Sequence, residues 1–298
     1  YAISGGDIND ASATICPGDD QPIIAATGLA AIAGAAGVAT ATYQWQYKVG
    51  SGSWADIIGE TGITLAAGSF NVTQTTQFKR VARATANGIT ASCDPENSAT
   101  TVTISVDADR NLAIATNDAD NTICSSDAIT FTGQNWQTGD AFRWLVNGAA
   151  SGPAGTASNT VVYSAAAGTI PNGATVRFEV TTSAGSCVYT EDVVINVATN
   201  PTATISSSAT GDTICSGDSV AITAGLVAGS TYSFTLEGVP VAGLGNVLTT
   251  TGITTDTTVG VTVTNAAGCS STATLTIFVP YAISGGDIND ASATICPG

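Results

Sequence analysis

The stretch VRFEVTTSAGSCVYTEDVVINV, residues 176–197, contains the features that decide the fold of this chain. Residues 176–180 alternate apolar and charged side chains, and apolar residues return at every second position through 193–197. A period of two predicts strands that bury one face. The short Ala-Gly turn between the two runs, followed by Cys187, predicts that these strands form a hairpin.

The same arrangement recurs before and after this stretch. Cys93 and Cys269 stand where Cys187 does, each after a Ser or Gly and before a final strand-like run. A run with a central aromatic residue lies upstream each time, and we expect these residues to anchor three cores: Trp45, Trp144 and Phe234. Frequent short strands, Gly/Ser/Thr turns and the lack of a helical period predict an all-β chain of three tandem immunoglobulin-like β-sandwich domains.

A second set of cysteines opens each segment within a Thr-Ile-Cys motif, at Cys16, Cys124 and Cys215. A fourth copy, at Cys296, belongs to residues 281–298, which repeat residues 1–18 letter for letter. We interpret the chain as one 280-residue repeat followed by the start of the next copy. The predicted domains are 1–107, 108–199 and 200–280, with 281–298 beginning the following repeat.

Six cysteines per repeat allow fifteen pairings. We call Cys93, Cys187 and Cys269 the closing cysteines, because each precedes the final strand of its segment. Because opening and closing cysteines alternate along the chain, we expect one disulfide in each domain: Cys16–Cys93, Cys124–Cys187 and Cys215–Cys269. Cys296 is then expected to pair beyond residue 298. Such bonds indicate an oxidising compartment and contribute about 4 kcal/mol each. A zinc site is not expected, because it needs closely spaced Cys pairs or His ligands.

The composition argues against several functional classes. The chain has 7 Lys+Arg, 23 Asp+Glu, no His and a net charge of −16. It lacks the basic surface that nucleic acids require, and no apolar run is long enough for membrane insertion. Without His, the common Ser or Cys nucleophile arrangements are absent as well. We therefore expect no enzymatic activity and no required cofactor.

Calcium is the one ligand that the sequence suggests. Acidic residues gather near the first domain boundary, at Asp107, Asp109, Asp118 and Asp120. Ca²⁺ prefers six to eight oxygen ligands, and a site between domains would stiffen the chain. The alternative interpretation is that these stretches are polar turns on an acidic surface.

The Thr-Ile-Cys-x-x-Asp opening, the central aromatic and the Gly/Ser-Cys closing resemble the immunoglobulin-like or PKD-like repeats of giant surface proteins of Bacteroidota. That group includes gliding adhesins and grappling appendages exported by the type 9 secretion route. The resemblance implies an extracellular, cell-surface location and a structural role in a filament or adhesin stalk. The alternative is a carbohydrate- or protein-binding module with recognition loops at the sandwich ends, for which residues 28–37 are the first candidate.

Modification and self-association are further expectations. Asn71 lies in a sequon, and three sites resemble the O-glycosylation sites of Bacteroidota: Thr213, Ser219 and Thr257. Charged residues make up only 10% of the chain, and the mean hydropathy is +0.27. Small domains expose much of their surface. We therefore expect lateral packing with identical copies, besides contact with adjoining repeats and a cell target bound through other domains. The alternative is a neutral surface that is soluble or glycosylated.

Overall fold

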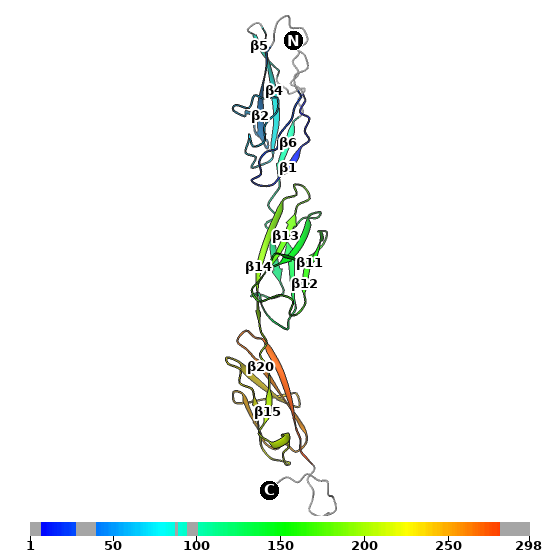
Figure 1. Cartoon of the computed structure of the whole chain (residues 1–298), viewed down its shortest axis with the longest axis vertical. Coiled ribbons are helices and arrows are strands. Elements are labelled where there is room, and N and C mark those ends of the chain that lie inside the picture. The colour runs from blue at the N-terminus through cyan, green and yellow to red at the C-terminus, as the bar shows by residue number, and fades with distance from the viewer. Residues whose placement is uncertain (1–6, 28–39, 87–88, 94–100, 281–298) are drawn as a thin grey trace, which may run out of the picture.

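The computed structural model describes residues 7–27, 40–86, 89–93 and 101–280, with the backbone alone for 40–41 and 83–93. In this part the chain forms three β-sandwich domains that follow one another end to end (Figure 1). None of its described helices is long and apolar enough to cross a membrane.

The second domain shows the topology most completely. One sheet has the strand order β11-β10-β13-β14-β8 and the other β12-β9-β7. The strands are β7 (Ala113–Thr116), β8 (Thr122–Cys124), β9 (Ile129–Gln134), β10 (Ala141–Val146), β11 (Ala149–Thr156), β12 (Val161–Ala165), β13 (Ala174–Thr181) and β14 (Val188–Ala198). In immunoglobulin lettering they are A, A′, B, C, C′, E, F and G. The predicted immunoglobulin-like fold is confirmed.

The core of the second domain lies between these two sheets. Trp144 on β10 faces Phe178 on β13 in the strand register, and their rings stack with centroids 4.7 Å apart. The inward residues of β13 are fully buried, as their period of two predicts. All three expected anchors, Trp45, Trp144 and Phe234, are at most 1% exposed.

The first domain has a sheet of order β1-β6-β4-β2-β3, with β5 also paired to β4. The opposite layer is held by the bridges Ile8–Ala26 and Ile24–Leu65. The strands are β1 (Ala13–Ile15), β2 (Thr40–Val49), β3 (Ala55–Asp56), β4 (Thr76–Ala86), β5 (Ile89–Cys93) and β6 (Val102–Val106). A separate buried cluster around Trp45 forms its core.

The third domain repeats the plan with sheets β15-β16-β19 and β18-β17-β20-β21. Its elements are β15 (Ile205–Ser207), the 3-10 turn η2 (Thr210–Asp212), β16 (Val220–Ala224), β17 (Thr231–Leu236), β18 (Val239–Val241), β19 (Val247–Thr250), β20 (Thr257–Thr264) and β21 (Ser270–Ile277). The predicted boundaries after residues 107 and 199 fall between β6 and β7 and between β14 and β15, and they stay predictions. Residues 281–298 lie outside the described part.

Strand direction fixes where the cysteines lie. In each domain the segment that leads to the opening cysteine runs parallel to the last strand: Ile15 pairs with Val106, Cys124 with Ala198, and Thr213 with Phe278. The opening cysteine therefore lies where the last strand ends, at the pole that faces the next domain. Cys187 and Cys269 directly precede β14 and β21, so they lie at the opposite pole.

Candidate functional site: two cross-linked domain junctions

Both disulfides that the structure resolves in full connect different domains. Cys16 of the first domain bonds Cys187 of the second, and Cys124 of the second bonds Cys269 of the third. Their Cα–Cα distances are 5.4 and 5.5 Å, typical of disulfides. Cys215 is also disulfide-bonded.

The predicted disulfides Cys16–Cys93, Cys124–Cys187 and Cys215–Cys269 are therefore wrong, and so is the expectation of one bond within each domain. A bond within one domain requires the A–B and F–G connections, which carry the two cysteines, to lie at the same rim of the sandwich. In the second domain the eleven-residue β14 separates them, with Cys187 before its start and Cys124 paired at its end. Eleven extended residues span roughly 36 Å. No disulfide bridges that distance.

The first junction is built around a buried arginine. Arg110 lies in the linker after β6, and its side chain is only 5% exposed. Its Nε and Nη2 donate to the two carboxylate oxygens of Asp140 at 3.0 and 3.3 Å. Its Nη1 donates to Asp107 Oδ1 at 3.2 Å. Because Asp107 ends the first domain and Asp140 belongs to the second, Arg110 joins the two.

Asp140 extends this cluster to the turn that carries the disulfide. Its carboxylate accepts hydrogen bonds from the backbone N–H groups of Gln137 at 2.9 Å and Ser183 at 3.3 Å, and Ser183 lies in the F–G turn with Cys187. Burial opposes ionisation of Asp140, but the hydrogen bonds from Arg110 and these N–H groups lower its pKa overall. The hydrogen bond with Asp140 is the main cause of the raised pKa of Arg110. The cluster therefore places one buried positive charge between two carboxylates.

The F–G turn of the second domain also packs closely on the first domain. A Cβ atom placed on Gly185 would lie 3.0 Å from Cys187 Sγ, 3.3 Å from Thr14 Cγ2 and 3.5 Å from Asp107 Cβ. Real Cβ atoms rarely approach neighbours so closely, so a side chain at this position would have to displace its neighbours by a few tenths of an ångström.

The second junction is held by hydrogen bonds of neutral side chains. Asn200, in the linker after β14, donates from Nδ2 to the carbonyl oxygen of Ser270 at 2.9 Å and to Ser126 Oγ at 3.1 Å. Its Oδ1 accepts a hydrogen bond from Ser125 Oγ at 2.8 Å. Ser125 and Ser126 follow Cys124, and Ser270 follows Cys269, so a single amide connects both sides of the disulfide.

Asn265 is the second amide of this junction. Its Nδ2 donates to the carbonyl oxygen of Thr199 in the linker at 2.9 Å. Its Oδ1 accepts from the backbone N–H groups of Ala267 and Cys269, each at 3.0 Å. Asn265 therefore shapes the F–G turn of the third domain and fastens it to the linker at the same time.

The acidic residues proposed for calcium make contacts within the protein. Asp107 binds Arg110, and Asp109 accepts a hydrogen bond from the N–H of Asn111. Asp118 and Asp120 both accept from the N–H of Thr122. In the part of the chain that the structure describes, no three His, Cys, Asp or Glu side chains gather as metal ligands. Calcium binding stays a prediction that these contacts do not support.

The proposed glycosylation residues differ in exposure. Asn71 and Ser219 are exposed, whereas Thr213 and Thr257 are half-buried, with hydroxyls that donate to backbone carbonyl oxygens. Glycosylation stays a prediction at all four. The candidate recognition loop at residues 28–37 lies outside the described residues.

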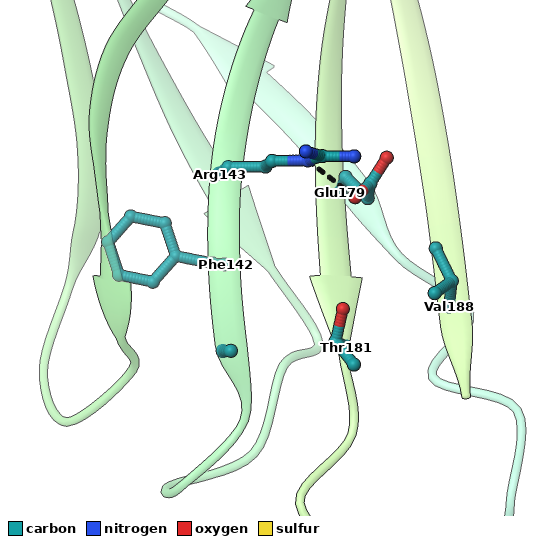
Figure 2. A pocket seen from close by; sticks show the side chains of 6 residues that line it. Phe142, Arg143, Glu179, Thr181 and Val188 are labelled. Carbon is teal, nitrogen blue, oxygen red and sulfur yellow. Dashed lines mark hydrogen bonds and ion pairs between the residues drawn. The ribbon is translucent and has the colours of Figure 1, made fainter. Parts of the chain in front are cut away.

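A shallow pocket lies on the outer face of the sheet in the second domain. In Figure 2, Arg143 on β10 reaches toward Glu179 on β13, with Thr181 and Val188 beside them. Arg143 Nε donates to Glu179 at 2.6 Å, and on the neighbouring strand pair Arg177 Nε donates to Asp192 at 2.7 Å. These are cross-strand ion pairs on a solvated sheet face.

Comparison with known proteins finds a family model that is similar to part of this chain. Residues 4–108 match one described as a domain of unknown function, DUF8696. No curated protein is similar in sequence.

Similar solved structures include a Ca²⁺-stabilised adhesin of an Antarctic bacterium that binds ice (16% identity, TM-score 0.40, covering 94% of this chain and 74% of that chain). A 1.5-MDa bacterial ice-binding adhesin has 18% identity and a TM-score of 0.39, and the match covers 93% of this chain and 97% of that chain. Titin domains I67–I69, in an E-to-A mutated variant, have 10% identity and a TM-score of 0.42, and the match covers 94% of this chain and 100% of that chain.

Proposed function

We propose that this chain is a structural repeat unit of a giant extracellular filament or adhesin stalk, which provides reach and mechanical strength. The observation that carries the proposal is that each of the two described junctions is crossed by both a peptide linker and a disulfide. Domains joined by a single linker generally move relative to one another. A second covalent connection beside the linker removes this freedom, as a load-bearing rod requires.

The polar contacts support the same role. Arg110 at the first junction, and Asn200 and Asn265 at the second, tie each linker to the domain that follows. Each linker is therefore fixed along its course instead of acting as a slack spacer. The role that we propose is mechanical and not catalytic.

Location and assembly are parts of this proposal. Disulfides between domains persist in oxidising surroundings, which favours an extracellular location. The identity of residues 281–298 with 1–18 favours a tandem array. Export by the type 9 route of Bacteroidota, lateral association with identical copies and a cell target bound through other domains follow from the sequence resemblance and the low charge content.

Electron microscopy of the native protein tests the proposal. Long strands such as β14 extend about 36 Å, so a repeat of three domains advances on the order of 100 Å. We expect straight threads with that period, which become visibly more flexible after disulfide reduction. Compact particles, or chains that bend freely at every junction before reduction, would contradict the proposed role.

A further inference from the structure

The two resolved disulfides overlap along the sequence. The first closes residues 16–187 into a loop and the second closes residues 124–269, so each loop contains one cysteine of the other bond. Every peptide bond from residue 16 to residue 269 therefore lies inside at least one loop. We propose that this crossed arrangement makes the rod tolerant of backbone cleavage, a property that goes beyond the mechanical role: its ends stay covalently joined after any one or two cuts in this region.

Severing the rod requires three cuts, one in each of three stretches. The bonded cysteines divide the region into a first stretch (16–124), a second (124–187) and a third (187–269). While one stretch is intact, its peptide connects one disulfide to the other, and the two ends remain joined. When all three are cut, the halves held by the two disulfides come apart.

The linkers between domains benefit most from this arrangement. Proteases preferentially cut exposed segments, and domain boundaries commonly lie in exposed linkers. Bonds confined to single domains would leave both linkers outside every loop, so one cut would divide the rod. Here the linker with Arg110 lies inside the first loop, and the linker with Asn200 lies inside the second. Cuts in either linker, or in both, leave all three domains joined.

Three exposed hairpin turns are distributed one to a stretch. Residues 50–53 between β2 and β3 belong to the first stretch, residues 147–148 between β10 and β11 to the second, and residues 237–238 between β17 and β18 to the third. All of these residues are exposed. Because the turns lie in different stretches, a protease has to cut all three of them before the rod separates.

The polar cluster of the first junction bridges a cut in its linker. Arg110 pairs with Asp107 before it and with Asp140 after it. The linker residues exposed on its two sides are Asp109 and Asn111. A cut before Arg110 leaves the pair with Asp107 across the gap, and a cut after it leaves the pair with Asp140. The first and second domains therefore keep a polar contact besides the disulfide.

The second junction has the same property. Asn200 donates to Ser126, which precedes it in the chain, and to the carbonyl oxygen of Ser270, which follows it. A cut on either side of Asn200 leaves one of these hydrogen bonds across the gap. At both junctions, one linker residue thus contacts both neighbouring domains.

Trypsin tests the proposal on the native chain. It can cut the second stretch after Arg143 and Arg177 but not the third, because no Lys or Arg follows Arg177. Its sites in the first stretch are Lys48, Lys79, Arg80, Arg83 and Arg110.

Complete digestion of the denatured, alkylated and unreduced chain therefore leaves one stretch intact. We expect a single disulfide-linked product in the mass spectrum that contains peptides 1–48, 111–143 and 178–298, and we expect reduction to separate them. Release of peptide 1–48 from peptide 178–298 before reduction would overturn the proposal.

A third cut in the remaining stretch is expected to part the two ends. The test uses a chain in which Cys93, Cys215 and Cys296 are replaced by serine, so that only the cysteines of the two resolved bonds remain. In this chain, Thr254→Lys adds a trypsin site at an exposed residue of the third stretch. The matched control, Ser53→Lys, adds one at an exposed residue of the first stretch, which trypsin already cuts.

The two variants are compared after equal thermal melts have shown that both are folded. We expect trypsin to part peptide 1–48 from peptide 255–298 in Thr254→Lys, whereas peptides 1–48 and 178–298 stay joined in Ser53→Lys. Ends that stay joined in Thr254→Lys, or that part in Ser53→Lys, would refute the requirement for three cuts.

Discussion

The two described junctions share one disulfide geometry but differ in their polar contacts. The first encloses Arg110 between two buried carboxylates, whereas the second uses the neutral amides of Asn200 and Asn265. No Lys or Arg occurs after Arg177, so the third domain has no cation for an ion pair. The disulfide is therefore the constant feature of a junction. The polar cluster determines how each junction responds to mutation and pH.

Removal of the buried Arg110 side chain is expected to have the largest effect on stability. Arg110→Ala leaves the carboxylates of Asp107 and Asp140 without their partner, and breaking a buried ion pair costs about 3–5 kcal/mol. We expect the second domain to lose that much stability in chemical denaturation. Arg143→Ala, which removes an exposed ion pair, is the matched control, with an expected loss below about 1 kcal/mol. Equal effects of the two variants would contradict the role of Arg110.

Acid is expected to destabilise the first junction by protonating Asp140. The lowered pKa of Asp140 means that its ionised form stabilises the folded state. This contribution is complete above the unfolded pKa near 3.8 and is lost as the pH falls toward the lower folded value. Asp140→Asn should remove this part of the acid dependence of the second domain in thermal melts. An unchanged acid profile in that variant would show that Asp140 does not carry the effect.

The smallest effect is expected at the second junction. Asn265→Ala removes neutral hydrogen bonds to Thr199, Ala267 and Cys269, each worth about 1 kcal/mol. We expect a modest fall in the melting temperature of the third domain. Asn246, which donates to Ala224 away from the junction, provides a control substitution. If Asn265→Ala alone makes the rod more flexible in electron micrographs, the junction role of Asn265 is supported; equal flexibility in both variants would refute it.

The sequence predicts the all-β fold and the core anchors because both depend on local periodicity. Val176, Phe178 and Val180 are all buried on β13 as their spacing requires. The disulfides depend instead on strand direction. The segment β8 has three residues, too few for a periodic pattern, and its parallel pairing with β14 cannot be recognised from spacing.

The buried cluster shows a second limit of sequence-based prediction. Asp140 lies thirty residues after Arg110, and nothing local connects them. The only available signal is composition: basic residues are rare in this chain, so an arginine in the six-residue linker between β6 and β7 stands out. Asp107 shows the opposite error, because a carboxylate that the sequence suggests for calcium instead binds Arg110.

Disulfide mapping of the oxidised chain tests the central claim most directly. A Cys296→Ser variant is suitable, because residues 290–298 otherwise yield the same peptide as 10–18. After cleavage before aspartate, we expect peptide 10–18 linked to 140–191, and 120–126 linked to 256–286. Links from 10–18 to 56–93 and from 120–126 to 140–191 would place the bonds within domains and contradict the account.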